Sequence, residues 1–137
     1  MLNHITIMGR LTRDPELRRT QNGKAVTTIT LAVERDIKNA QGERETDFID
    51  CVFWEGSAEF VTHSFQKGRM ATVEGRLQSR RYTDKNDNKR MAWEIHASNI
   101  YFADSKRDTA DSAANGTDAS SQSDGFAEVE DDGELPF

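Results

Sequence analysis

The sequence predicts a small, mainly β domain: a five-stranded barrel with one helix between the third and fourth strands, followed by a disordered acidic tail. Three observations indicate this class. Apolar residues recur at every second position over five stretches, which is the period of a half-buried strand. One stretch after the third strand has helical spacing instead. The final thirty residues are acidic, polar and without periodicity.

The first two strands are expected at 4–11 (HITIMGRL) and 25–35 (AVTTITLAVER). In each, one parity is apolar and is expected to face the core. These residues are Ile5, Ile7, Gly9 and Leu11 in the first strand and Ile29, Leu31 and Val33 in the second. Turn signals at 14–16 (DPE) and 21–23 (QNG) separate the two strands.

The third strand, at 48–54 (FIDCVFW), buries Ile49, Cys51 and Phe53, and it follows a turn signal at 39–42. A helix is then expected within 56–68, because Ala58, Val61 and Phe65 have helical spacing and a glycine at position 68 stops the pattern.

The fourth and fifth strands are expected at 70–82 (MATVEGRLQSRRY) and 91–98 (MAWEIHAS), separated by the turn signal DKNDN at 84–88. Their core-facing residues are Ala71, Val73, Gly75, Leu77, Met91, Trp93, Ile95 and Ala97. Trp93 is therefore expected in the core. This element order is that of an OB-fold, a small, partly open barrel.

The face that should be polar carries large aromatic residues. Phe48 and Trp54 lie opposite the apolar parity of the third strand, and Arg76, Arg80 and Tyr82 share the wet face of the fourth. Arg10 and Arg35 are candidate additions from neighbouring strands. Aromatic rings stack on unpaired bases and cations track phosphates, so the pattern indicates single-stranded nucleic acid. The alternative is that Phe48 and Trp54 pack under the helix or a loop.

Two long loops add further cations, which would either extend the nucleic-acid-binding surface or simply be solvated. These cations are Lys38, Arg44, Lys85, Lys89 and Arg90.

No catalytic or metal-ligating constellation is expected. The three histidines lie in separate elements, and no phosphate-binding glycine loop or cofactor motif occurs. Asp47 and Asp50 would suit a metal-dependent nuclease, but loop or wet-face acids explain them better. The single cysteine, Cys51, excludes an internal disulfide and favours a reducing compartment. No signal peptide or membrane span is recognised, so a cytoplasmic protein is expected.

Charge divides the chain. Residues 1–107 hold all 18 Lys and Arg against 15 Asp and Glu, a net +3, whereas residues 108–137 hold 9 acids and no base. We therefore expect a mildly basic domain at 1–104, a disordered linker at 105–130 and an acidic-hydrophobic tip at 131–137 (DDGELPF). An apolar end on a solvated tail suits a groove on another protein.

At this point the motifs resemble a known family. MLNHITIMGRLTRDPELRRTQNGKAVTTITLAVER, ERETDFIDCVFWEGSAE and KGRMATVEGRLQSRRYTDK, with the terminal DDGELPF, are similar to the bacterial single-stranded DNA-binding proteins (SSBs), of the Gram-positive or phage type. The resemblance implies an OB-fold homotetramer that binds and protects single-stranded DNA. It also implies a nucleoid-associated protein that recruits replication, recombination and repair proteins.

The resemblance also assigns residues. Base stacking falls on Phe48, Trp54 and Tyr82, and a fourth family aromatic is replaced by Ile37. The strand pattern itself, not the resemblance, provides the candidate phosphate contacts, which are Arg10, Arg35, Arg76, Arg80 and Arg81. The candidate partner-docking residues are Asp131, Asp132, Glu134, Leu135, Pro136 and Phe137. No cofactor and no enzymatic activity are expected. An OB-fold nuclease and an RNA-binding or protein-docking module stay open as alternatives.

Overall fold

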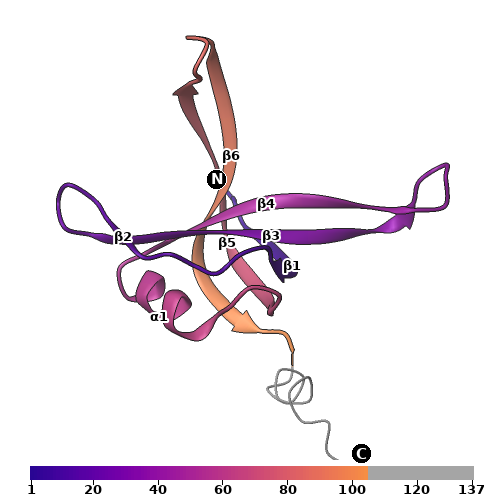
Figure 1. Ribbon diagram of the computed structural model, residues 1–137, viewed down its shortest axis with the longest axis horizontal. Helices are drawn as coiled ribbons and strands as arrows, with labels where there is room; N and C mark the ends of the chain where they lie inside the picture. Colours follow the sequence, from indigo (N-terminus) through magenta and orange to yellow (C-terminus); the bar gives the residue numbers. More distant parts are fainter. Residues whose placement is uncertain (105–137) are drawn as a thin grey trace, which may run out of the picture. The chain divides into compact units, whose positions relative to one another are not determined.

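The computed structural model describes residues 1–104, and the predicted linker and tip lie outside the described residues (Figure 1). Within residues 1–104 the fold contains one helix and five long strands, as the sequence predicts, and one very short extra strand. The elements are β1 (Ile5–Leu11), β2 (Arg18–Arg19), β3 (Ala25–Lys38), β4 (Arg44–Trp54), α1 (Gly56–Ser64), β5 (Met70–Thr83) and β6 (Lys89–Phe102). The two-residue β2 is too short to give a periodic signal.

The strands form a single sheet that closes on itself. Its order is β1-β5-β6-β4-β3-β2, and an additional pairing between β1 and β3 completes the barrel. The pairings are antiparallel except for β4 with β6, which run parallel over only three residue pairs, Asp50–Val52 with Glu94–His96. The predicted five-stranded OB-fold barrel with a helix after the third long strand is confirmed.

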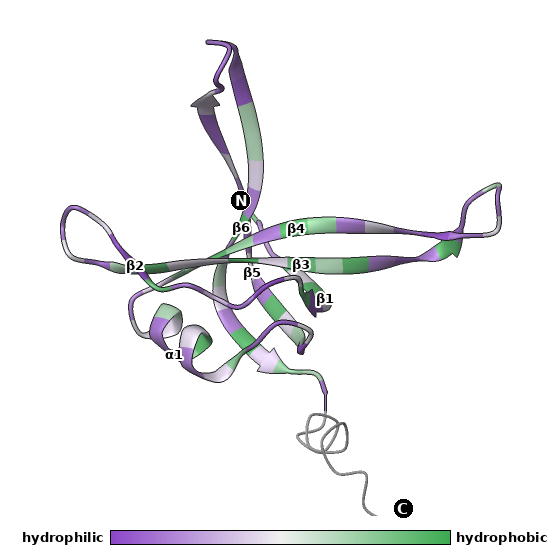
Figure 2. Cartoon of the chain, viewed as in Figure 1, coloured by the Kyte–Doolittle hydropathy of each residue, from purple (hydrophilic) through white to green (hydrophobic). Residues whose placement is uncertain are grey.

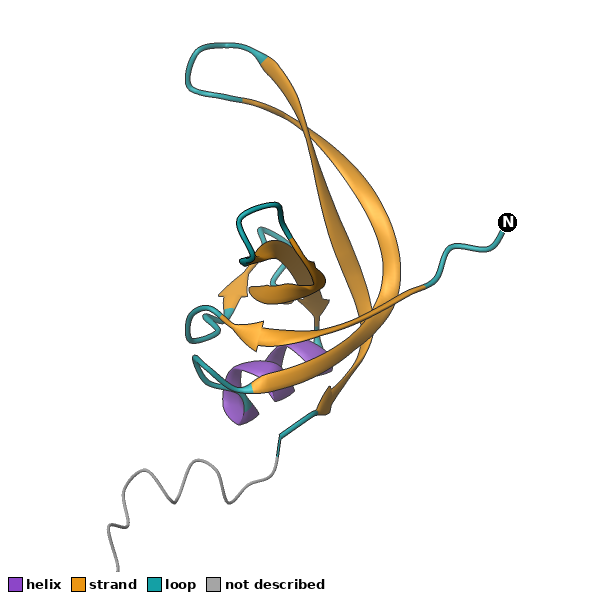
Figure 3. Cartoon of the chain, turned by 90° about the vertical axis from the view of Figure 1, so that its right-hand side faces the viewer, coloured by secondary structure: helices purple, strands orange, loops and turns teal. Residues whose placement is uncertain are grey.

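The core is built from the predicted parity. Leu11, Ile29, Leu31, Phe53 and Val73 are at most 2% exposed. The helix covers one end of the barrel (Figure 3) with Ala58, Val61 and the following Phe65, which are buried as their spacing predicts. A fully buried Val, Leu, Ile or Phe side chain contributes about 1.5–3 kcal/mol, so this cluster is the main source of the domain's stability.

Cys51 lies inside this core. Burial, reinforced by the nearby charge of Asp50, raises the pKa of its thiol to about 12. The thiolate is the reactive form of cysteine, so Cys51 acts as a small apolar core residue.

Two hairpins extend beyond the barrel as arms, β3–β4 and β5–β6 (Figure 1). The sequence expectation fails in the second arm: Trp93 is 60% exposed, and Met91 and Leu77 are also exposed. The alternation itself is correct, because these residues continue the parity of the fully buried Ile95. The barrel ends at that point, since β4 pairs with β6 only as far as Glu94, and no other element within residues 1–104 covers this face of the arm.

The end of the domain is fastened to the barrel. Arg69, just before β5, donates from Nε and Nη2 to the carboxylate of Asp104 at 3.0–3.2 Å, and the Met70 amide donates to the same carboxylate at 3.3 Å. The hydrogen bonds from Arg69 hold the pKa of Asp104 below its usual value. Among residues 1–104, no helix is long and apolar enough to cross a membrane.

Candidate nucleic-acid interface

The non-core parity of three neighbouring strands forms one outward surface, which we call the outer sheet surface. Strand register joins its members: Trp54 and Val52 lie two residues apart on the same face of β4, Val52 pairs with His96 on β6, and His96 pairs with Arg76 on β5. The surface comprises Phe48, Asp50, Val52, Trp54, Arg76, Gln78, Arg80, Tyr82, Arg90, Ala92, Glu94 and His96, of which Val52 is buried beneath its neighbours.

The three predicted stacking aromatics are accessible on this surface. Phe48 is 67% exposed, Trp54 41% and Tyr82 40%. Phe48 and Trp54 are therefore not covered by the helix or a loop, as the alternative interpretation required. Phe48 lies opposite Ala32, whose single methyl group covers little of the ring, and Arg10 lies on the far side of Ala32. An exposed ring of this kind offers a free face to a nucleobase.

Trp54 and Arg76 meet at a hollow of about 470 Å³. The hollow combines an aromatic wall with a cation and with polar side chains from the N-terminal segment and β6. Its lining residues are Asn3, His4, Trp54, Gly75, Arg76, His96, Ala97 and Ser98. An indole beside a guanidinium can receive a base and its phosphate together.

Tyr82 also has a cation beside it. The Arg80 guanidinium carbon lies 5.7 Å from the centre of the Tyr82 ring, within the range of a cation–π contact. Arg80 Nε also lies 3.6 Å from Glu94 Oε2, and His96 Nε2 lies 3.1 Å from Glu94 Oε1. Glu94 therefore holds Arg80 and His96 on the outer sheet surface. Neither Glu94 nor His96 was predicted as a site residue, although their parity on the fifth long strand places both on this surface.

Arg35 is held by acids of its own arm. Its Nε and Nη2 donate to the two carboxylate oxygens of Asp47 at 2.9 Å, and Nη1 donates to Glu45 at 2.7 Å. These contacts raise the pKa of Arg35 and lower that of Asp47, chiefly through the hydrogen bonds between the two. A phosphate would have to compete with both carboxylates for Arg35.

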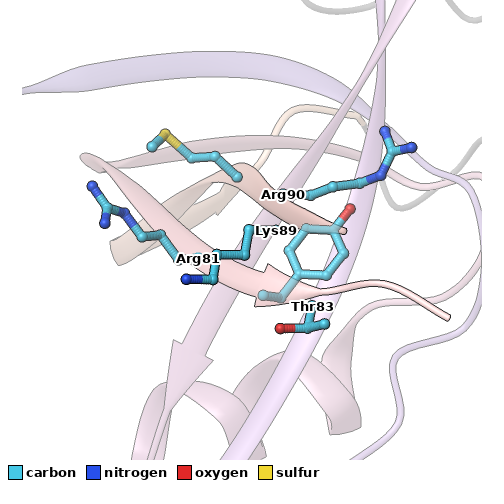
Figure 4. A pocket seen from close by; sticks show the side chains of 6 residues that line it. Arg81, Thr83, Lys89 and Arg90 are labelled. Atoms are coloured by element: carbon cyan, nitrogen blue, oxygen red, sulfur yellow. The ribbon is translucent and has the colours of Figure 1, made fainter. Parts of the chain in front are cut away.

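Of the remaining predicted cations, Arg10 adjoins the outer sheet surface across Ala32, whereas Arg81 lies on the other face of the β5–β6 arm. Arg10 Nη1 donates to the Gly68 carbonyl at 3.0 Å. Arg81 pairs across the arm with Met91, whereas Tyr82 pairs with Arg90, so Arg81 lies on the opposite face of the arm from Tyr82. Figure 4 shows Arg81 and Arg90 pointing to opposite sides of the arm.

The acids considered for a nuclease do not converge. Asp47 is bound to Arg35, and Asp50 accepts a hydrogen bond from the Thr30 hydroxyl at 2.6 Å. The two residues have opposite parity on β4, so their side chains leave the strand on opposite faces. Within residues 1–104 no group of three or more metal-ligating side chains is assembled.

Comparison with known proteins finds a family match and several similar proteins. A model described as the Single-strand binding protein family matches residues 2–103. The chain is 48% identical over 106 residues to single-stranded DNA-binding protein A of Bacillus subtilis, and 50% identical over 111 residues to single-stranded DNA-binding protein 3 of Listeria innocua. It is 47% identical over 116 residues to a single-stranded DNA-binding protein of Halalkalibacterium halodurans.

These matches cover 77%, 80% and 84% of this chain, respectively. They cover 62%, 69% and 68% of the three relatives, so a considerable part of each relative lies outside the matched region. The family model matches residues 2–103, and this range includes every residue of the outer sheet surface.

Proposed function

The chain belongs to the single-strand binding protein family, and on that premise we propose that it binds single-stranded DNA without regard to base sequence. Phe48, Trp54 and Tyr82 stack on bases, and Arg76 and Arg80 contact phosphates. Arg10, Arg35 and Arg81 are proposed as further phosphate contacts. The binding is non-enzymatic and needs no cofactor.

The observation that carries this proposal is the pairing of exposed rings with cations on one surface. Trp54 shares its hollow with Arg76, and Tyr82 lies against Arg80. Stacking contributes about 1–3 kcal/mol per base and tolerates any base, because every base has a π face. Duplex DNA hides those faces, so the same surface favours unpaired strands.

The nuclease alternative is disfavoured by the acids themselves. Both oxygens of Asp47 are engaged by Arg35, and Asp50 leaves the strand on the other face. The RNA-binding alternative uses the same rings and cations and differs only in the sugar. The relatives' names specify DNA, which favours DNA for this chain.

The finer parts of the proposal rest on the family resemblance. We propose a homotetramer that is cytoplasmic and associated with the nucleoid through bound DNA. We also propose that the tip, Asp131–Phe137, recruits replication, recombination and repair proteins. Acids would steer the tip towards a basic rim, and the Phe137 ring with its carboxylate would enter a pocket beside an Arg or Lys. Residues 105–137 lie outside the described structure.

The test is a titration of the full chain with oligo-dT followed by tryptophan fluorescence, with a duplex of equal length as the control. We expect quenching by the single strand, at least tenfold weaker binding of the duplex, and a log K that falls linearly with log salt. Equal affinity for both forms would contradict stacking. A labelled strand incubated with the protein and magnesium should stay intact, and cleavage would favour the nuclease.

A further inference from the structure

The β5–β6 arm has two faces, and the outer sheet surface uses only one of them. Cross-strand pairing puts Arg80 with Ala92 and Tyr82 with Arg90 on that face. The other face, which we call the Trp93 face, contains the pairs Leu77–Ile95, Ser79–Trp93, Arg81–Met91 and Thr83–Lys89. The Trp93 face is the extension of the core parity beyond the end of the barrel.

Three large apolar side chains are exposed on this face. Trp93 is 60% exposed, Met91 49% and Leu77 38%, whereas Ile95 at the base of the arm is fully buried. Figure 2 shows a hydrophobic segment on β6 within an otherwise hydrophilic arm. Contiguous exposed apolar side chains rimmed by charge indicate a surface that is covered by a ligand or partner in use.

The charge of the arm specifies what kind of occupant fits. Residues 76–93 contain six cations and two acids, Asp84 and Asp87. Asp84 is engaged by Arg90, whose Nε lies 2.6 Å from it. No ion pair found within residues 1–104 involves Arg81 or Lys89, the two cations of the Trp93 face. An apolar ring flanked by unneutralised cations matches a polyanion that carries flat apolar groups.

The end of the arm connects its two faces. A hollow of about 420 Å³ is lined by residues of both: Arg81, Thr83, Lys89 and Met91 from the Trp93 face, with Tyr82 and Arg90 from the other (Figure 4). A strand stacked on Tyr82 therefore has a cationic passage around the arm towards Trp93. Trp93 follows Met91 on the same face of β6, so a strand that follows this passage is directed towards the indole.

We propose that Trp93 is a further base-stacking residue, and that single-stranded DNA leaving the outer sheet surface wraps around the β5–β6 arm onto the Trp93 face. Arg81 and Lys89 contact the phosphates there. This inference rests on the proposed function. It assigns a role to a tryptophan that the sequence pattern places only in the core. The β5–β6 arm would then carry a stacking ring, whereas the large apolar side chain exposed on the β3–β4 arm is Ile37, which has no ring.

The two tryptophans of the chain allow each face to be followed separately. Trp54→Phe leaves Trp93 as the only indole, and Trp93→Phe leaves Trp54. Each variant is titrated with oligo-dT of increasing length. We expect both indoles to be quenched by long strands, and Trp93 to need a longer strand than Trp54 because the DNA must first pass around the arm.

Affinity gives a second readout. Trp93→Ala should weaken binding of a long strand by about 5- to 150-fold, the equivalent of one stacked base at 1–3 kcal/mol. Trp93→Tyr, which keeps an aromatic plane, should stay within about threefold of the wild type. Because Trp93 is exposed, circular dichroism should show that both variants fold.

The outcomes separate this inference from the proposed function. Quenching of Trp54 with no response of Trp93 at any length, and unchanged affinity of Trp93→Ala, would overturn the wrapping proposal and leave single-strand binding intact. No response from either indole would overturn both. A second copy of the chain on the Trp93 face would also overturn it: Trp93 emission in Trp54→Phe would then shift to the red on dilution, and Trp93→Ala would lower the mass measured by light scattering.

Discussion

Replacing Gly75 with alanine should destabilise the domain, because two strands touch at this glycine. Gly75 lies at an irregularity in the β5–β6 pairing, between Glu74 and Gly75, where the register shifts. A Cβ at position 75 would clash with the His96 carbonyl oxygen and would lie 2.8 Å from the Ala97 Cα and 2.9 Å from the His96 carbonyl carbon. These atoms are backbone and cannot rotate away, so β5 and β6 must separate.

The expected cost follows from these contacts. Carbon atoms pack at about 3.5–4.0 Å, so the strands must move apart by more than half an ångström. Overpacking of this kind costs about 1–3 kcal/mol, and a weakened ladder hydrogen bond adds about 0.5–1.5 kcal/mol. Alanine also leaves the unfolded chain with less conformational entropy than glycine does, which offsets about 0.4–1 kcal/mol of this cost. We expect a net loss of about 1–3 kcal/mol.

Gly56 provides the matched control. It is the first residue of α1, and a Cβ there would meet no atom within 4 Å. Gly56→Ala therefore makes the same chemical change without the clash and should be neutral or slightly stabilising. Urea unfolding followed by circular dichroism, at one protein concentration, measures both variants. If Gly75→Ala were as stable as Gly56→Ala, the inference that β5 and β6 are too close at Gly75 to admit a Cβ atom would be refuted.

Three further predictions concern the Arg69–Asp104 contact at the end of the domain, the arginines proposed to contact phosphates (the phosphate track), and the tip. Asp104→Asn should cost about 1–3 kcal/mol, because Arg69 loses its charged acceptor. Since the pKa of Asp104 is lowered by folding, its contribution is present above the unfolded carboxyl pKa of about 4 and disappears as the pH falls through the folded value, which urea unfolding against pH would show. Arg76→Ala and Arg80→Ala should each flatten the slope of log K for oligo-dT against log salt by about 0.7; an unchanged slope would remove that arginine from the phosphate track. Deleting Phe137 should abolish the capture of replication and repair proteins from a bacterial lysate while DNA affinity is unchanged, and equal capture with and without Phe137 would make the tip irrelevant to docking.

Period-two patterns predicted the strands because the part of each strand that lies in the barrel has one buried face. Ile29 and Leu31 alternate with polar residues and are buried in the barrel. The same rule predicted the wrong environment for Trp93. Periodicity shows that Trp93 lies on the same face of the strand as the buried Ile95, but it does not show how far the barrel extends along the strand. The end of the barrel depends on the short parallel pairing of β4 with β6, which joins segments more than 40 residues apart.

The candidate site was predicted in composition but not in its pairings. The wet-face parity identified Phe48, Trp54 and Tyr82, and all three are exposed. The engagement of Arg35 by Asp47 and Glu45 was not predicted, because it depends on the register of the β3–β4 hairpin. Sequence alone gives the side chains of a strand's face, whereas register decides which of them neutralise one another.

The central claim is that exposed aromatics of the outer sheet surface bind single-stranded DNA by stacking. The most direct measurement compares the oligo-dT affinities of Phe48→Ala, Trp54→Ala and Tyr82→Ala with that of Phe60→Ala. Phe60 is an equally accessible aromatic, 45% exposed, but it lies on α1 against Phe65 and Phe102. We predict losses of about 1–3 kcal/mol for each of the first three variants and none for Phe60→Ala, with all four folded by circular dichroism. Unchanged affinity of the outer-surface variants, or an equal loss for Phe60→Ala, would contradict the account.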